Sequence, residues 1–162
     1  MKKVILGMMA LALLHMGGAY AQSPNGRGEA TLTLDGGKVS IDYGRPKLKG
    51  RDLEGMIAVG DEWRMGADAG TTLSTEVPLK FGSKVVDKGK YVLRAKLVAK
   101  EKWHLIIQKL EDKAVAAEVP LTYQKADNSL EELTIKLEKQ GTGGKFTLQW
   151  GKLSISTDFQ KG

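Results

Sequence analysis

The chain has 162 residues, a formal net charge of +6, two histidines and no cysteine. Without cysteine it forms neither a disulfide nor a lipid-modified N-terminal cysteine, and two histidines leave little for a zinc site, which needs about three protein ligands. The basic residues are interspersed along the chain rather than gathered in a stripe with aromatic residues, so the composition argues against a nucleic-acid-binding protein.

Residues 1–21 have the three parts of a secretory signal peptide. Lys2 and Lys3 form a basic start, residues 4–14 form an apolar stretch, and residues 19–21 (AYA) match the A-x-A cleavage pattern. The apolar stretch is too short for a spanning helix, which needs about 20 residues. We therefore expect an exported protein, periplasmic or secreted, whose mature chain has no membrane span.

The next residues predict a polar lead-in followed by a β-hairpin. Residues 22–28 are rich in glycine, proline and asparagine, which indicates a flexible segment. Hydrophobic and polar residues then alternate with a period of two over 30–34 and again over 39–43. The glycine-rich turn at 35–37 between them is a hairpin signal.

Beyond an irregular segment, alternation returns in short stretches that are separated by turns. The predicted strands cover residues 71–76, 79–81, 84–86, 91–98, 103–110, 130–137, 146–150 and 153–159, with a weaker candidate at 115–124. No stretch predicts a helix of normal length. About nine or ten short strands are typical of an antiparallel sandwich or barrel. We therefore predict an all-β chain in which residues 29–160 form a single antiparallel β-sandwich, jelly-roll-like or another Greek key.

The segment 43–72 interrupts the alternation and concentrates side chains that a strand does not need. Arginines can bind a carboxylate or phosphate through two parallel hydrogen bonds. A tyrosine and a tryptophan could form the walls of a pocket. The segment therefore predicts a site for a small anionic or sugar-like ligand, or for an acidic segment of a partner. The candidate ligand-binding residues are Tyr43, Arg45, Arg51, Trp63, Arg64 and Thr72.

Two other interpretations of this segment stay open. The arginines could pair with nearby carboxylates and brace a long loop, with Trp63 filling the core. Alternatively, a carboxylate beside the arginines could serve a hydrolase that acts on an envelope or extracellular polymer. The candidate carboxylates are Asp42, Asp61, Glu62 and Asp68.

The sequence favours a binding domain over an enzyme. Signal-peptide cleavage would remove His15 and leave His104, which is predicted to lie in the middle of a strand. No serine lies in a G-x-S-x-G elbow, so nucleophilic catalysis has little to use. We expect no cofactor, no metal and no nucleic-acid partner, and the sequence leaves the oligomeric state open.

Several short blocks along the chain carry a family resemblance. They are YGRP (43–46), KGR (49–51), WRxGA (63–67), TT (71–72), GKY (89–91), WxxII (103–107) and LxWG (148–151). In this order they resemble the bacterial family DUF2911, whose members are exported and whose function is unknown. The resemblance implies export and an all-β fold, and it implies no activity. The family usually reads close to WRxGANEATT, whereas this chain has Asp68, Ala69 and Gly70 after Ala67, so any ligand contact made there by the family's Asn and Glu is changed.

Overall fold

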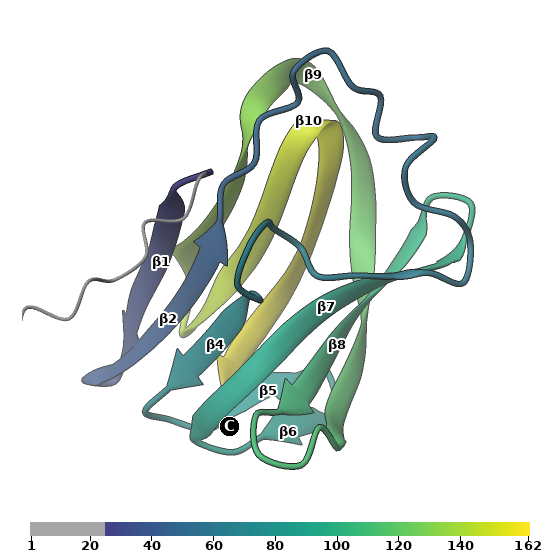
Figure 1. Cartoon of the computed structure of the whole chain (residues 1–162). Helices are drawn as coiled ribbons and strands as arrows, with labels where there is room; N and C mark the ends of the chain where they lie inside the picture. Colours follow the sequence, from purple (N-terminus) through teal and green to yellow (C-terminus); the bar gives the residue numbers. More distant parts are fainter. Residues whose placement is uncertain (1–24) are drawn as a thin grey trace, which may run out of the picture.

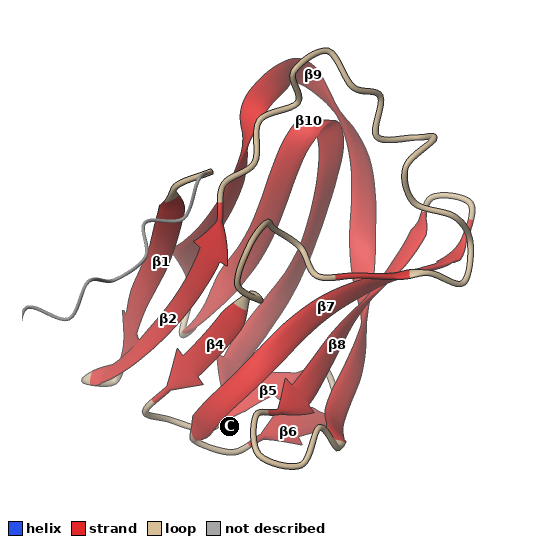
Figure 2. Cartoon of the chain, in the orientation of Figure 1, coloured by secondary structure: helices blue, strands red, loops and turns tan. Residues whose placement is uncertain are grey.

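The computed structural model describes residues 25–162, which form ten strands and no helix (Figures 1 and 2). The strands are β1 (Arg27–Leu34), β2 (Gly37–Gly44), β3 (Glu62–Trp63), β4 (Thr72–Thr75), β5 (Leu79–Phe81), β6 (Lys84–Val86), β7 (Gly89–Ala99), β8 (Lys102–Lys109), β9 (Val115–Gln140) and β10 (Gly143–Lys161). The all-β prediction is confirmed. The predicted signal peptide lies outside the described residues. Within those residues, no helix could cross a membrane.

One antiparallel sheet contains all the strands and folds over into two layers. The strand order is β1-β2-β4-β7-β8-β9-β10-β5-β6, and β3 pairs with β7. β9 carries the sheet from one layer to the other. Its first part, residues 115–121, pairs with β8, and the rest, residues 122–140, pairs with residues 143–156 of β10. Figure 1 shows β9 and β10 behind β2 and β4.

A short second pairing links the two layers near the end of β2. The Leu48 N–H donates to the Glu131 carbonyl at 2.9 Å, and the Leu133 N–H donates to the Pro46 carbonyl at 3.1 Å. An isolated antiparallel bridge between Lys47 and Glu132 lies at the same place. The chain that leaves β2 is thereby fixed to the edge of β9 that β10 does not occupy.

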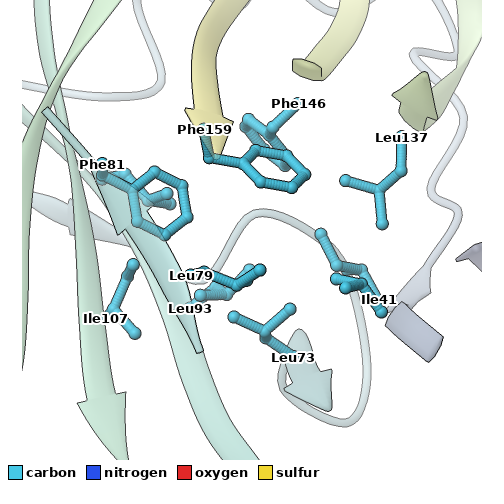
Figure 3. A pocket seen from close by; sticks show the side chains of 11 residues that line it. Ile41, Leu73, Leu79, Phe81, Leu93, Ile107, Leu137, Phe146 and Phe159 are labelled. Carbon is cyan, nitrogen blue, oxygen red and sulfur yellow. The ribbon is translucent and has the colours of Figure 1, made fainter. Parts of the chain in front are cut away.

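The core lies between the layers and follows the predicted alternation. In β2, for example, Val39, Ile41 and Tyr43 are buried, whereas Lys38 and Asp42 are exposed. Figure 3 shows apolar side chains of both layers around an interior cavity of about 10 Å³. That volume holds about one water molecule and the lining is apolar, so this cavity is a packing gap and not a ligand site.

The strand boundaries differ from the prediction in four places. β9 and β10 have 26 and 19 residues, where the sequence predicts pairs of short strands. Gly151 does not end a strand: its φ is +57° and the register shifts on both sides of it, as at a β-bulge. β3 lies inside the segment predicted to be irregular, and β1 begins at Arg27, within the predicted lead-in. These boundaries depend on pairing with strands that are distant in the sequence, and the local alternation of residues does not predict that pairing.

Candidate functional site

Residues 46–61, which we call the strap, connect β2 to β3 without regular structure (Figure 2). The strap is fixed at one end to β9 by the pairing described above. At its other end the Gly60 N–H donates to the Leu97 carbonyl at 2.7 Å, and the Leu97 N–H donates to the Asp61 carbonyl at 3.2 Å. The strap therefore runs from β9 to β7 (Figure 1), and the space beneath it is bounded on both sides.

A cleft of about 750 Å³ lies beside the strap. Its other walls come from β7, the β7–β8 turn, β8, β9 and β10. Ligand pockets commonly have volumes of about 300–1,000 Å³, so the cleft can hold a small molecule.

The inner face of β9 leads from the core into this cleft. Leu121 is buried, Tyr123 is half-buried and Lys125 is exposed, and the three share one face because side chains alternate along a strand. On the neighbouring strand β10, Ile155 lies opposite Tyr123, and Leu153 lies opposite Lys125. The cleft is therefore the open end of the space between the two layers.

The irregularity at Gly151 shapes the floor of the cleft. Gly151, Lys152 and Leu153 all line it, although successive residues of a regular strand face opposite sides. A Cβ atom on Gly151 would lie 3.4 Å from Leu48 Cδ1 and 3.5 Å from Leu53 Cδ1. The leucines of the strap thus pack directly on the backbone of β10 at the bulge.

Three tryptophans from different parts of the chain form a cluster next to the cleft. The ring of Trp63 stacks on Trp150 at 6.0 Å with an interplanar angle of 13°, and it meets Trp103 edge to face at 6.3 Å. The Arg51 guanidinium lies over Trp150, with Cζ 5.6 Å from the ring centroid. Trp103 and Trp150 are only 5% and 3% exposed. Both rings are therefore buried against Trp63, and Trp150 is also covered by Arg51.

Tyr123 presents a neutral hydroxyl to the cleft. Burial raises the pKa of its phenol, and the negative charges of Glu101 and Glu54 raise it further. The phenol therefore keeps its proton at neutral pH and can donate a hydrogen bond. Within residues 25–162, the hydroxyl has no hydrogen-bond partner in the protein.

Charged side chains of both signs line the cleft. The cations are Arg51, Lys100, Lys125 and Lys152, and the carboxylates are Asp52, Glu54 and Glu101. Arg51 is engaged with the strap itself, because its Nε and Nη2 donate to the carbonyls of Leu48 and Lys47 at 2.9 and 2.7 Å. Among the described residues, the three lysines form no ion pair.

The structure brings two of the six predicted site residues together. Arg51 and Trp63 both contact Trp150 beside the cleft. Tyr43 is buried in the core, and its hydroxyl donates to the Ile135 carbonyl at 3.4 Å. Thr72 lies in β4, opposite Asp42 in the register with β2.

The other two predicted arginines hold the backbone of neighbouring segments. Arg45 pairs with Glu132, at 3.1 Å, and its Nε donates to the Leu133 carbonyl at 3.4 Å. Arg64 donates to the Asp68 carbonyl at 2.9 Å. Neither residue lines the cleft. The role of the six residues in binding a ligand stays a prediction, and four of them lie where a structural role accounts for their contacts.

The carboxylates suggested for a hydrolase do not converge at the cleft. Asp42 pairs with Arg27, and Asp61 accepts a hydrogen bond from the Ala58 N–H at 3.1 Å. Glu62 is exposed on β3, and Asp68 lies 3.4 Å from the Asn25 amide. Of the residues that do line the cleft, the sequence predicted Arg51 alone and missed the others. The one local signal for them is the presence of apolar residues in the strap, of which Leu48, Leu53, Ile57 and Val59 line the cleft.

Two blocks of the family signature pack against each other through their backbones. A Cβ on Gly44 would lie 2.0 Å from the Ala67 carbonyl oxygen, and one on Gly66 would lie 3.0 Å from the Gly44 oxygen. The Thr71 hydroxyl, which is buried, closes this turn by donating to the Met65 carbonyl at 3.1 Å. These glycines are therefore required by a close approach of two chain segments.

Replacing Arg45 with alanine is expected to lower the free energy of unfolding by about 1 kcal/mol. The Arg45 and Glu132 side chains are 36% and 39% exposed, so solvent screens the pair and limits its contribution. Lys38→Ala is the control, because the ion pair of Lys38 with Glu29 is more exposed, at 54% and 55% of the two side chains. This substitution should lower the free energy of unfolding by only roughly 0–0.5 kcal/mol. Urea unfolding of both variants measures the difference, and equal losses would argue against a brace at Arg45.

Comparison with known proteins agrees with the resemblance seen in the motifs. A family model described as "Protein of unknown function (DUF2911)" matches residues 23–159, nearly the whole chain. No curated protein and no solved structure matches. The family resemblance is thus confirmed.

Proposed function

Because the chain belongs to the DUF2911 family, whose function is unknown, we propose a role from its structure: a non-enzymatic domain that binds a small anionic ligand in the cleft beside the strap. The observation that carries the proposal is a cleft of about 750 Å³ lined by Lys100, Lys125 and Lys152. Each lysine ammonium can donate three hydrogen bonds to an anion. With Arg51, the cations of the cleft exceed its three carboxylates by one.

The tryptophan cluster favours an anionic ligand over a sugar. A sugar ring needs an open aromatic face to stack on, and the faces of Trp103 and Trp150 are buried in the cluster. The aromatic ring that is available in the cleft is that of Tyr123, which is half-buried. If the chain is exported, as residues 1–21 predict, the ligand is one that occurs outside the cytoplasm.

The proposal predicts that binding depends on the lysines of β9 and β10. Isothermal titration of the purified protein with hexanoate, benzoate, citrate and inorganic phosphate is expected to show saturable binding of at least one anion. The double variant K125A/K152A should bind it at least about tenfold more weakly, which corresponds to ~1.4 kcal/mol. Raising the salt concentration should also weaken binding, because the lysines are exposed.

Lys80→Ala provides the matched control for this titration. Lys80 is an exposed lysine on β5, and it pairs with Gln160 near the far end of β10. Its removal changes the net charge in the same direction without touching the cleft. If K125A/K152A bound the anion as well as Lys80→Ala does, the proposed site would be wrong.

A further inference from the structure

We propose that the ligand of the cleft is a single-chain amphiphile, an aliphatic carboxylate whose chain lies under the strap and whose head group lies at Lys125 and Lys152. This inference rests on the proposed function and adds a chemical class and an orientation to it. It follows from how apolar, neutral polar and cationic groups are ordered from the core to the mouth of the cleft.

One part of the lining of the cleft is aliphatic. Leu53 and Ile57 of the strap, Leu97 of β7 and Leu153 of β10 line it, and all four are half-buried and packed against the core. Apolar side chains that stay partly exposed in a concave site gain free energy when an apolar ligand covers them. An inorganic anion or a sugar would leave this surface in contact with water.

The polar groups follow in order along the inner face of β9. Leu121 is 7% exposed at the core end, Tyr123 comes next with its free hydroxyl, and Lys125 is exposed at the mouth. Lys125 lies opposite Leu153, so a cation and an apolar side chain lie next to each other across the two strands. A carboxylate at the mouth can accept hydrogen bonds from Lys125 and from the Tyr123 hydroxyl while its chain contacts Leu153.

The carboxylates of the cleft favour a head group with one negative charge. Asp52 and Glu54 come from the strap and Glu101 from the β7–β8 turn, whereas Lys125 and Lys152 come from β9 and β10. Four cations against three carboxylates leave one net positive charge, which a single carboxylate neutralises. Citrate or phosphate would add further negative charge near Glu54 and Glu101, which costs free energy at short range.

A series of straight-chain carboxylates tests the class and the orientation. Hexanoate, octanoate, decanoate and dodecanoate, each below its micelle concentration, are titrated into the full-length protein by calorimetry. We expect one ligand per protein and about fourfold tighter binding for each added methylene, which corresponds to ~0.8 kcal/mol. Dodecanol and dodecylammonium should bind at least about tenfold more weakly than dodecanoate.

Two variants separate the chain from the head group. Leu97→Ser should weaken the binding of dodecanoate more than that of hexanoate, because Leu97 lies across Trp103 from Leu121, at the core end of the cleft. Val85→Ser, which changes an exposed valine on β6, should weaken neither. K125A/K152A should weaken the binding of all four carboxylates by a similar factor and leave the gain in affinity per methylene unchanged. Thermal unfolding of each variant checks that it is folded at the temperature of the titration.

The outcomes distinguish this inference from the proposed function. If carboxylates bind through the lysines but affinity does not rise with chain length, the aliphatic class is wrong and the anion site stands. If dodecanol binds as tightly as dodecanoate, or if K125A/K152A binds carboxylates like the wild type, both this inference and the proposed function are wrong. Binding of several chains per protein would mean non-specific adsorption and would also overturn the inference.

Discussion

Replacing Trp150 with alanine is expected to lower the free energy of unfolding by about 3–5 kcal/mol, the range for truncating a large buried aromatic side chain. Trp150 is 3% exposed, stacks on Trp63 and lies under the Arg51 guanidinium. Its Nε1–H also donates to the Glu131 carbonyl at 3.2 Å. The same carbonyl accepts the hydrogen bond from the Leu48 N–H that fixes the strap to β9. Alanine leaves a cavity and removes all three contacts.

Chemical denaturation of Trp150→Ala and Trp150→Phe checks this expectation. Phenylalanine keeps an aromatic ring in the cluster and loses the N–H donor, so its loss should be smaller than that of alanine. Val115→Ala, at a valine that is 57% exposed, should stay within about 0.5 kcal/mol of the wild type. A loss below about 1 kcal/mol for Trp150→Ala would show that the cluster contributes little to stability.

The same substitution should also affect the cleft. Trp150 connects Arg51 of the strap to Trp63 of β3, and Trp63 in turn contacts Trp103, which lines the cleft. Losing the Trp150 ring removes the support of Trp63, which in turn supports Trp103 in the wall of the cleft. We therefore expect Trp150→Ala to weaken anion binding even under conditions where the variant is fully folded.

Gly44→Ala is expected to lower the free energy of unfolding by about 3 kcal/mol or more. The new Cβ would lie 2.0 Å from the carbonyl oxygen of Ala67 and 2.8 Å from its backbone nitrogen, so backbone has to move. Overpacking a rigid site typically costs about 1–3 kcal/mol, and a clash with backbone lies at the upper end because no side chain can rotate away.

Gly55→Ala is the matched control for Gly44→Ala. Gly55 lies in the strap, and a Cβ there meets nothing within 4 Å. Its φ is not positive, so alanine adopts its conformation without strain. Thermal and urea unfolding should place Gly55→Ala within about 0.5 kcal/mol of the wild type. Similar stabilities for the two variants would mean that the segments around Gly44 and Ala67 separate easily.

The contact between Gly44 and Ala67 explains much of the family signature in structural terms. The YGRP block ends β2, the WRxGA block follows β3, and the two meet at these residues. The arginines near this contact bind carbonyl oxygens: Arg27 donates to Ala69 at 3.0 Å and Arg64 donates to Asp68 at 2.9 Å. Carbonyl contacts do not depend on side-chain identity, so Asp-Ala-Gly at 68–70 is compatible with them.

The sequence by itself determined the β-structure of this protein. Period-two alternation and turn residues act over a few neighbouring positions, and they report which side chains face the core. The hairpin at the start of the domain is an example. Its turn was predicted at residues 35–37, and Asp35 and Gly36 connect the paired residues Leu34 and Gly37 with φ values of +46° and +78°, as a two-residue hairpin turn requires. Tyr43, by contrast, was expected at a ligand site, and the same alternation correctly places it with the buried Val39 and Ile41.

Only the tertiary structure decided where a ligand can bind. The cleft is made by the strap, β7, the β7–β8 turn, β8, β9 and β10, which are up to about a hundred residues apart in the chain. Trp63, Trp103 and Trp150 likewise meet only because β3, β8 and β10 converge. Such contacts depend on how strands pair over long distances and on the bulge at Gly151, and neither leaves a periodic pattern in the residues themselves. For this reason the sequence located the irregular segment, whereas the fold selected the few of its residues that reach the cleft.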